Sequence, residues 1–469
     1  MHLTPGATPP EILASLWALA GGPRRALDDV ALTGREPALP SSFRVGAVAQ
    51  TTIAASALAA AELWRQRTGR RQSVSVDMRH AAIEFRSERY QRLADRPPGP
   101  TWDKIAGVYA TGDGHKVRLH TNFPHHRDGI LKLLGVTYER EAVAKALMRW
   151  EAEPFETAVA KAGLVATMLR TPAEWAEHPQ GQAVAGLPLF EINKIGEAPP
   201  RALGSNPARP LAGVRVLDLT RVIAGPVCGR ALAAHGAEVM RVTAPHLPGF
   251  ADLDIDTGRG KLSTALDLRA LEDRDRLTGL LRQAHIFVQG YRPGGLAALG
   301  FSPEACADIR PGIIAVTLSA YGHEGPWASR RGFDSLVQNA SGINVAEAEA
   351  AGVPAPRELP AQALDHASGY LMAFAALIAL ARKAELGGSW HVRVSLAQTG
   401  HWLSQLGRLS DGFSASDPKL GDIGDLLEAA DTPFGRVSYL RHAGVLSETP
   451  PAWVRPAVPL GTHAPVWPE

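Results

Sequence analysis

The sequence predicts an α/β protein, with a Rossmann-like parallel-sheet large domain joined to a small α+β domain. From Leu211 onward, helical segments separate four β-branched runs, VRVLDLT, AEVMRVT, HIFVQGY and GIIAVTLSAYG. This alternation is typical of βαβ units and a parallel sheet. Earlier in the chain, GVYAT and KVRLHT flank a DG turn and precede helical segments, which predicts the small domain. Pro- and Gly-rich stretches at 91–104 and 196–210 predict the linkers around it.

These patterns divide the chain into four segments. Residues 1–95 are predicted to be a partial copy of the helical part of the large domain, and residues 100–205 the small domain and its linker. Residues 211–408 form the predicted Rossmann-like domain. Residues 409–469 include a Pro- and Gly-rich tail with little periodicity, which we expect to pack on the large domain.

The partial copy is an internal echo between residues 45–90 and 363–408. Each stretch has a long Ala-rich helix, a basic C-terminal turn, a Gly-containing break, an alternating strand (VSVDM or VRVSL) and a further helix. Aligning the two strands places Ala47 opposite Asp365 and Thr51 opposite Gly369. Only the second copy therefore carries a carboxylate at this position.

Composition indicates a globular protein, with 45% apolar and 20% charged residues. The net charge of +2 gives no overall electrostatic case for binding nucleic acid or an anionic membrane. The most apolar segment, 367–381, is shorter than the ~20 residues of a membrane span and is predicted to be a buried core helix. Cys228 and Cys306 form no disulfide framework, and no Lys or Arg precedes the short N-terminal apolar stretch. We therefore expect a cytoplasmic protein.

Four histidines, at positions 115, 120, 125 and 126, are the one group that suggests a metal site. Their spacing suits no single helix face, and no Cys or Glu completes a ligand set. We expect surface or core histidines and no metal.

Three loops are candidates for binding an anion. Asp218 ends the first strand of the large domain, and Val222, Ala224 and Gly225 follow in a turn that opens a helix, whose free N–H groups could face a phosphate. Because no G-x-G-x-x-G pattern is present, a purely structural turn is favoured on this evidence alone. Two further loops carry cations among glycines, and each alone is more often a solvated charge; these cations are Arg259, Lys261 and Arg292.

Asp365 precedes the long apolar helix of the second copy. Aspartate is a preferred N-cap residue, which is the simpler interpretation of this position. The alternative is a nucleophile, because a helix N-terminus favours the ionised carboxylate.

From Leu211 to Leu406 the sequence resembles family III CoA-transferases, the CaiB/BaiF type that includes the formate and carnitine CoA-transferases. The resemblance is carried in order by LAGVRVLDLTRVIAGPVCGRALAAHGAEVMRV, GRGKLSTALDLR, FVQGYRPGGLAALGF, IIAVTLSAYGHEGPW, RRGFDSLVQNASG and ALDHASGYLMAFAALIALARK. This order of motifs is far more specific than any one of them.

The resemblance implies an enzyme that moves CoA between an acyl-CoA and a carboxylic acid, with Asp365 as the acyl-accepting nucleophile. CoA is then a substrate and not a permanently bound cofactor. The implied CoA contacts are Val222, Lys261 and Arg292, and the loop residues Ala224, Gly225 and Arg259 complete the candidate binding set. Residues 211–408 become the CoA-binding catalytic domain.

The chain departs from the family in the order of its parts, because a small domain and a degenerate helix precede the large domain. We therefore expect either an interlocked homodimer or a monomer in which two partial copies complement each other. Thr243 stands where the family has an acidic residue, and Gly290-Tyr291 replaces its Asn-Phe. Adenine or phosphate contacts are therefore expected to differ.

Three other functions remain open. The related acyl-CoA racemases have Gly-His-Asp where this chain has Gly332-Phe333-Asp334, and the missing histidine disfavours racemisation or isomerisation. The rearranged order of parts leaves open a non-catalytic CoA-binding homologue. The absence of a dinucleotide fingerprint disfavours a nicotinamide-dependent dehydrogenase.

Overall fold

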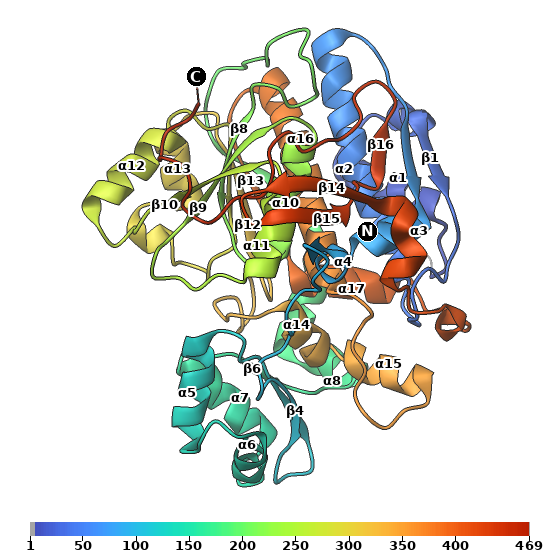
Figure 1. The fold of residues 1–469 in the computed structure, drawn as a ribbon, viewed down its shortest axis with the longest axis vertical. Helices are drawn as coiled ribbons and strands as arrows, with labels where there is room; N and C mark the ends of the chain where they lie inside the picture. The colour runs from blue at the N-terminus through green and yellow to red at the C-terminus, as the bar shows by residue number, and fades with distance from the viewer. Residues whose placement is uncertain (1–4, 469) are drawn as a thin grey trace.

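The computed structural model describes residues 5–468, and at its centre lies a seven-stranded sheet (Figure 1). All neighbouring strands are parallel except β13 and β7, which are antiparallel. Counted along the chain from β8, the first six strands lie in the order 3-2-1-4-5-6, which is that of the Rossmann fold. The predicted α/β fold class is confirmed. The strands across the sheet are β10 (Lys261–Ala265), β9 (Glu238–Thr243), β8 (Arg215–Leu219), β11 (Ile286–Gln289), β12 (Ile314–Ser319), β13 (Ser389–Ser395) and β7 (Phe190–Gly196).

Helices cover both faces of this sheet because its strands are apolar on both sides. On one face, Val216 and Val288 pack in the core that contains α10 (Ala224–Ala234) and α16 (Ala363–Leu386). On the other face, Leu217 and Phe287 pack in a second core. That core is built with α12 (Leu271–Leu281) and α13 (Pro303–Ile309).

The internal repeat in the sequence corresponds to a repeated unit in the structure. Helices α2 (Val45–Thr68) and α16 each have 24 residues and pack against one another. Strand β2 (Val74–Asp77) and helix α3 (Met78–Glu84) follow α2, as β13 and α17 (Leu396–Gln405) follow α16. The rest of the N-terminal segment consists of α1 (Pro9–Leu19), the 3-10 helix Arg24–Asp29, β1 (Val30–Thr33), α4 (Ser87–Tyr90) and β3 (Arg92–Leu93).

Helix α16 is the one helix among residues 5–468 that is long and apolar enough to cross a membrane. Of its most apolar 18-residue window, 94% is buried inside the protein. This is the environment expected of a core helix.

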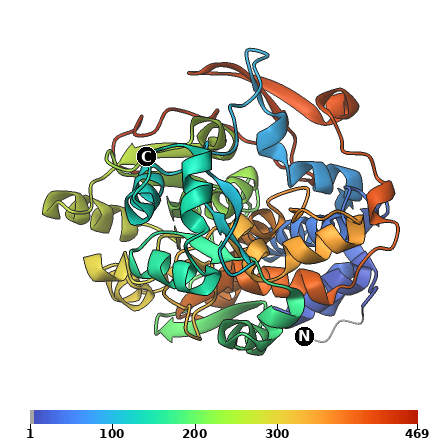
Figure 2. The same ribbon diagram turned by 90° about the horizontal axis from the view of Figure 1, so that it is seen from below.

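The small α+β lobe lies below the large sheet in Figure 1, and Figure 2 shows it from below. Its antiparallel sheet is β4 (Gly107–Ala110), β5 (Lys116–Leu119) and β6 (Ala166–Met168). Three helices share a separate core with it, α5 (Pro124–Leu134), α6 (Arg140–Leu147) and α7 (Ala152–Lys161). The chain then passes through α8 (Pro172–Glu177) and α9 (Pro179–Gly186) to β7, which belongs to the large sheet. Helix α14 (Asp334–Ala340) lies between the lobe and the body, and α15 (Ile343–Ala351) lies beside the lobe (Figure 1).

The C-terminal segment connects the N-terminal copy to the large sheet. After the 3-10 helix Leu420–Leu426, β14 (Leu427–Thr432) and β15 (Gly435–Leu440) form a sheet with β3, and β16 (Gly444–Leu446) pairs with β2. The tail then runs beside β10, where the N–H of His463 donates to the carbonyl of Ser263 over 2.7 Å. Trp467 packs in the core around α12 and donates to the carbonyl of Leu280.

Candidate active site

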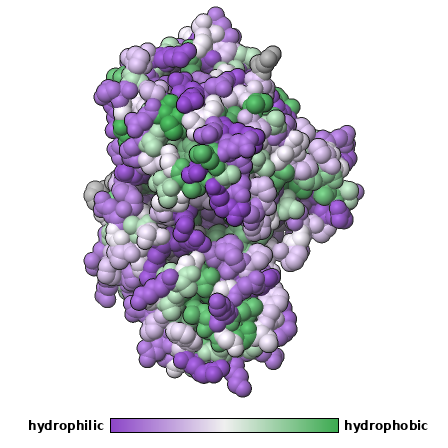
Figure 3. Space-filling view, turned by 90° about the vertical axis from the view of Figure 1, so that its left-hand side faces the viewer, coloured by the Kyte–Doolittle hydropathy of each residue, from purple (hydrophilic) through white to green (hydrophobic). Residues whose placement is uncertain are grey.

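A cavity of about 670 Å³, which we call cavity A, opens at the carboxyl ends of β8, β9, β11 and β12. Strands β8 and β11 are neighbours at the point where the strand order reverses, which is where open α/β sheets bind ligands. The small lobe approaches the cavity from the other side with Phe123, His125 and His126. The surface is hollowed between the lobe and the body (Figure 3).

Asp365 lines cavity A from the first turn of α16 and is 8% exposed. The turn is held by Asp334, whose carboxylate accepts the backbone N–H groups of Leu364 (2.8 Å) and Asp365 (2.9 Å). Asp334 thus satisfies N–H groups that a helix start leaves without partners. The Asp365 carboxylate has no hydrogen-bond partner within residues 5–468, so it faces the cavity unengaged.

Gly369, one turn further along α16, allows this helix to approach α10. A Cβ atom on Gly369 would lie 2.5 Å from the carbonyl oxygen of Ala224 and 2.8 Å from Cβ of Val227. Any side chain here would therefore push the two helices apart. The spacing of Asp365 and Gly369 in the sequence has a physical reason, because the glycine brings the start of α10 beside the aspartate.

The surroundings of Asp365 disfavour its ionised form. Burial raises the pKa of the Asp365 carboxyl well above its usual range, and the nearby carboxylates of Asp334 and Glu88 raise it further. Burial also raises the pKa of Asp334, against the hydrogen bonds that it accepts. The dipole of α16 acts in the opposite direction at Asp365, by about 0.3–1 kcal/mol at exposed sites and more where water is excluded.

Glu88 is a residue of the N-terminal copy that lies next to the active site. Its Oε2 lies 3.2 Å from Nε2 of His366, the residue after Asp365. Burial opposes ionisation of Glu88, but the hydrogen bond and charge of His366 hold the pKa of Glu88 below its usual value. Two residues of the first copy extend this contact, because Glu84 accepts the Tyr370 hydroxyl and Ser87 donates to Asp256 over 2.7 Å.

The loop before α10 presents its backbone to cavity A. Val222 has φ +72°, a left-handed conformation that is costly for a β-branched residue. Val222, Ile223 and Ala224 all line the cavity, and α10 begins at Ala224. The strained turn therefore aims the free N–H groups of a helix start at the cavity.

Arginines make cavity A suited to phosphate groups. Arg292 lines it, as the family resemblance implies, and so do Arg221 and Arg331. Arg221 stacks on the Phe123 ring of the small lobe at 4.8 Å, which connects the two walls. Arg269 and Arg330 also line the cavity, which makes five arginines. A guanidinium group can donate two parallel hydrogen bonds to phosphate oxygens, so the cavity fits an ADP-like anion.

Three candidate residues lie outside the lining of cavity A. Lys261 is 1% exposed, and its Nζ donates to Asp218 (2.7 Å) and to the carbonyl of Pro226 (2.8 Å). Arg259 is buried in an ion pair with Asp256 at 2.8 Å. Gly225 is packed inside α10, where a Cβ would meet Thr220 at 2.4 Å. In this structure the two cations neutralise buried carboxylates and the glycine allows close packing.

The small lobe supplies cavity residues that are not in the predicted CoA-binding set, although its histidines were considered as metal ligands. Phe123, His125 and His126 line cavity A together with Phe333, and the His120 ring stacks on Phe333 with centroids 3.9 Å apart. Burial lowers the pKa of His120 and His126 to about 3, which favours their neutral forms. No cluster of three metal-ligating side chains occurs within residues 5–468. The only available signal was position, because these residues follow directly after β5.

The sequence of the large domain matches a known protein family. Residues 211–424 match the sequence profile of CoA-transferase family III. This chain contains a CoA-transferase family III domain.

The relatives of this chain carry names that agree with this domain. An acetyl-coenzyme A transferase, nodX, of Hypoxylon pulicicidum is 29% identical over 78% of this chain and 70% of its own length. An acyl-CoA transferase of Gibberella moniliformis is 30% identical over 64% of this chain but 58% of its own length. A probable fatty acyl-CoA transferase of Mycobacterium tuberculosis, Rv3272, is 35% identical over 41% of this chain and 52% of its own length. Its crystal structure matches 43% of this chain and 57% of that chain, with 34% identity and a TM-score of 0.39.

The positions at which this chain departs from the family pattern lie on the wall of cavity A. Thr243 and Tyr291 line it, and so does Phe333, which stands where the related racemases have a histidine. These departures therefore lie at the cavity surface.

The buried pair of Lys261 and Asp218 gives a test of what Lys261 does. We expect Lys261→Met to lower the free energy of unfolding by about 3–5 kcal/mol, because it leaves Asp218 buried without a counterion. The double variant Lys261→Met/Asp218→Asn should recover most of this loss in denaturant unfolding. The double variant should also bind CoA within a few-fold of the wild type. A stable double variant with CoA affinity reduced tenfold or more would instead show that Lys261 contacts the ligand.

Proposed function

We propose that this chain is a CoA-transferase that moves CoA from an acyl-CoA to a carboxylic acid, with Asp365 as its nucleophile. The observation that carries the proposal is the position of the Asp365 carboxylate, which is buried, unengaged and on the wall of a cavity that suits an ADP-like anion. The family III domain and the names of its relatives support the reaction class.

The reaction begins when a carboxylate oxygen of Asp365 attacks the thioester carbonyl of the donor. The C–S bond breaks, which gives an acyl–aspartyl anhydride and CoA thiolate. The thiolate attacks the aspartyl carbonyl, and the donor leaves as a carboxylate while an aspartyl-CoA thioester forms. An acceptor carboxylate then displaces CoA to form a second anhydride. The returning thiolate takes the acceptor acyl group and regenerates Asp365, so no proton is gained or lost overall.

Burial of Asp365 serves this chemistry. A carboxylate in water is a weak nucleophile because hydration stabilises its charge, whereas the dry site and the neighbouring Asp334 and Glu88 make the anion less stable and more reactive. The N–H groups at the strained Val222 turn are positioned at the cavity wall to stabilise a developing oxyanion. The small lobe excludes water, which would hydrolyse an anhydride.

Replacing the nucleophile should stop CoA transfer but leave CoA binding largely intact. We expect Asp365→Asn to lower kcat at least ~10³-fold, because the amide cannot form the anhydride, while CoA affinity stays within a few-fold. The measurement is CoA transfer across a panel of acyl-CoAs and acids, with mass spectrometry of the peptide that contains Asp365 for a covalent adduct. The matched control is Asp308→Asn, at an exposed position on α13, which should behave as the wild type. Near-normal turnover by Asp365→Asn, or α-carbon deuterium exchange without any acceptor acid, would contradict the proposal.

The pH dependence of CoA transfer should depend on the ionisation of Asp365 and on the charge of its neighbour Asp334. Because the pKa of Asp365 is raised, the rate should increase with pH as this carboxyl ionises, over a range well above its usual value. Asp334→Asn removes a negative charge beside Asp365, so the pKa of Asp365 should fall and the acid limb of kcat/KM should move to lower pH by about one unit. An acid limb that stays in place in this variant would show that another group controls it.

We also propose that one chain forms a complete active site. The N-terminal copy supplies Glu88, the small lobe supplies Phe123, and the large domain supplies Arg292 and Asp365. Light scattering should give the single-chain mass of 49.9 kDa, with activity per chain independent of concentration. If sites formed between chains, mixing Asp365→Asn with Phe123→Ala would restore activity, and we expect no such rescue.

A further inference from the structure

The end of cavity A that holds Asp365 is lined by apolar groups from several elements. Ala224 lines it at the start of α10, and its carbonyl oxygen faces Gly369, one turn along α16 from Asp365. Leu396 lines it at the start of α17. A hydrogen bond of 2.8 Å between two hydroxyl groups joins the first turn of α17 to α16 near its start. Both apolar side chains therefore lie close to the nucleophile.

Ala320 and Phe333 extend this apolar wall. The carbonyl of Ala320 accepts the N–H of Ala397 on α17 over 2.9 Å. A Cβ on Gly332 would lie only 2.7 Å from the Cβ of Ala320, so the glycine allows Phe333 to approach the end of β12. Phe333 directly precedes Asp334, whose carboxylate accepts the N–H of the nucleophile. We call Ala224, Ala320, Phe333 and Leu396 the acyl wall.

The small lobe covers the acyl wall with further rings. The Phe123 ring lies 5.9 Å from that of Phe333 and 4.6 Å from that of Phe250, measured between ring centres. The His126 ring lies 6.2 Å from that of Phe333. The pKa of His126 is lowered to about 3, mainly by burial, so this ring is neutral near pH 7. The lobe thus adds aromatic surface and no charge.

The arginines beside Phe333 in the chain direct their charges away from Asp365. The guanidinium of Arg330 lies over the Trp327 ring, 4.2 Å from its centre. Burial and the charge of Arg292 lower the pKa of Arg331, so these two guanidinium groups are close to one another. No cation within residues 5–468 is among the charges that shift the pKa of Asp365.

This distribution of charge restricts the acyl group that Asp365 can receive. The acyl group is bonded to the carbonyl that Asp365 attacks, so it must lie beside the nucleophile. Donor and acceptor acyl groups occupy this place in turn, because each forms an anhydride with Asp365. A carboxylate on the acyl chain would meet the negative charges of Asp334 and Glu88 without a cation to pair with.

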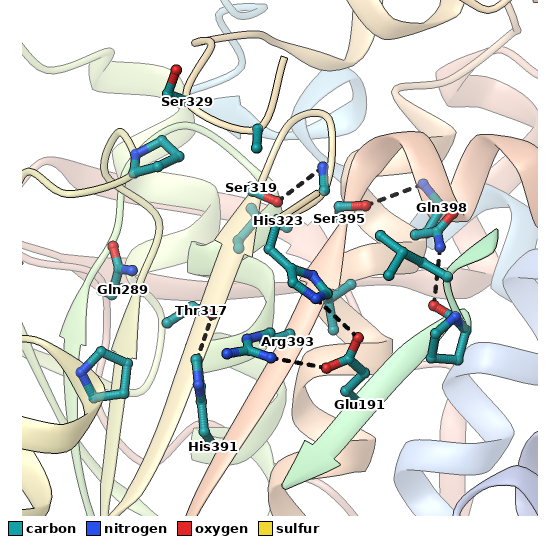
Figure 4. A pocket seen from close by; sticks show the side chains of 18 of the residues that line it. Glu191, Gln289, Thr317, Ser319, His323, Ser329, His391, Arg393, Ser395 and Gln398 are labelled. Atoms are coloured by element: carbon teal, nitrogen blue, oxygen red, sulfur yellow. Dashed lines mark hydrogen bonds and ion pairs between the residues drawn. The ribbon is translucent and has the colours of Figure 1, made fainter. Parts of the chain in front are cut away.

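A longer acyl chain finds no available cation in the neighbouring cavity. That cavity, of about 510 Å³, adjoins cavity A at Leu318 and Ser319, which line both. The arginine in its lining, Arg393, pairs with Glu191 at 3.1 Å, and Glu191 also contacts His323 at 3.3 Å, as the dashed lines in Figure 4 show. The charge of Arg393 is therefore already compensated.

We propose that the acyl groups transferred by this chain are apolar and uncharged, so that its donors are CoA thioesters of monocarboxylic acids and its acceptors are monocarboxylic acids. The acyl wall and the rings of the lobe are complementary to an aliphatic or aromatic group, and they exclude dicarboxylic acids. This inference rests on the proposed function, because it concerns the group that Asp365 attacks.

Two donors of equal chain length test the proposal in the wild type. Butyryl-CoA and succinyl-CoA both carry four-carbon acyl groups, which end in a methyl group and a carboxylate respectively. With pentanoate as the common acceptor, we expect kcat/KM to be at least ~100-fold higher for butyryl-CoA, because like charges in a closed site cost several kcal/mol. The methyl ester of succinyl-CoA, whose charge is masked, should recover most of this difference. Equal use of the two donors, or a preference for succinyl-CoA, would overturn the proposal.

Equilibrium binding separates this proposal from the proposed function. Calorimetric titration of the Asp365→Asn variant should show butyryl-CoA binding about tenfold more tightly than succinyl-CoA, since Asp334 and Glu88 keep their charges. If neither thioester binds and the wild type transfers no acyl group, the proposed function is wrong and this inference falls with it. If both bind equally and the wild type transfers both, only this inference is overturned.

A cation placed in the acyl wall should reverse the preference. We expect Leu396→Lys to raise the ratio of kcat/KM for succinyl-CoA to that for butyryl-CoA at least ~10-fold, because the ammonium group can pair with the distal carboxylate. The matched control is Leu386→Lys at the other end of α16, where the leucine is 61% exposed and the ratio should not change. Thermal unfolding checks that each variant is folded, and Phe333→Lys gives the same test from another element. An unchanged ratio in the folded variants would show that the acyl wall does not contact the acyl group.

Discussion

The close approach of α10 and α16 at Gly369 is the constraint on which the active site depends. With no side chain on Gly369, the second turn of α16 lies against the first turn of α10. The carboxylate of Asp365 is then held beside the strained Val222 loop and the switch point of the sheet. Asp334 holds the same turn from the other side through two backbone N–H groups. The backbone at Asp365 is thus positioned by helix packing and by Asp334, and not by contacts of its own carboxylate.

The two copies of the nucleophile helix show which part of this arrangement is structural. In the first copy, the Glu36 carboxylate accepts the N–H of Ala47, the residue opposite Asp365, as Asp334 accepts the N–H of Asp365 itself. The helix start is thus capped by a carboxylate in both copies, but only the second has a carboxylate on the helix to be positioned. Burial raises the pKa of Glu36 to about 7. The first copy has become a scaffold, since α2 packs along α16 and Glu84 and Glu88 reach into the second half.

Local patterns in the sequence were sufficient to predict the sheet and the repeated helices, because alternation and helical periodicity record which faces of each element are buried. The role of Asp365 was implied by the family resemblance and stays a prediction. Local patterns could not separate Arg292 from Lys261, since both are cations in loops beside glycine. Only the partners differ, and Asp218, which neutralises Lys261, is 43 residues away in the chain. The strands of the C-terminal segment were missed for a related reason. Strand β15 pairs with β3 and β16 pairs with β2, near the other end of the chain, and no local pattern records such partners. Strand β14 pairs only with β15, so the prediction also missed a local hairpin.

The residues that the small lobe contributes to cavity A also depend on contacts between distant parts of the chain. Their importance lies in the exclusion of water. An anhydride survives only where water is excluded, and the large sheet alone leaves cavity A open on the side of Phe123 and His125. The lobe covers that side with aromatic rings, because a stack of His120, Phe333 and Phe123 excludes water without adding charge. The neutral form of His126 is consistent with this role, since a cation there would stabilise the Asp365 anion and weaken it as a nucleophile. The charges that act on the Asp365 carboxyl are thus the two carboxylates of Asp334 and Glu88, which destabilise its anion, and the arginines of cavity A remain available to an anionic ligand.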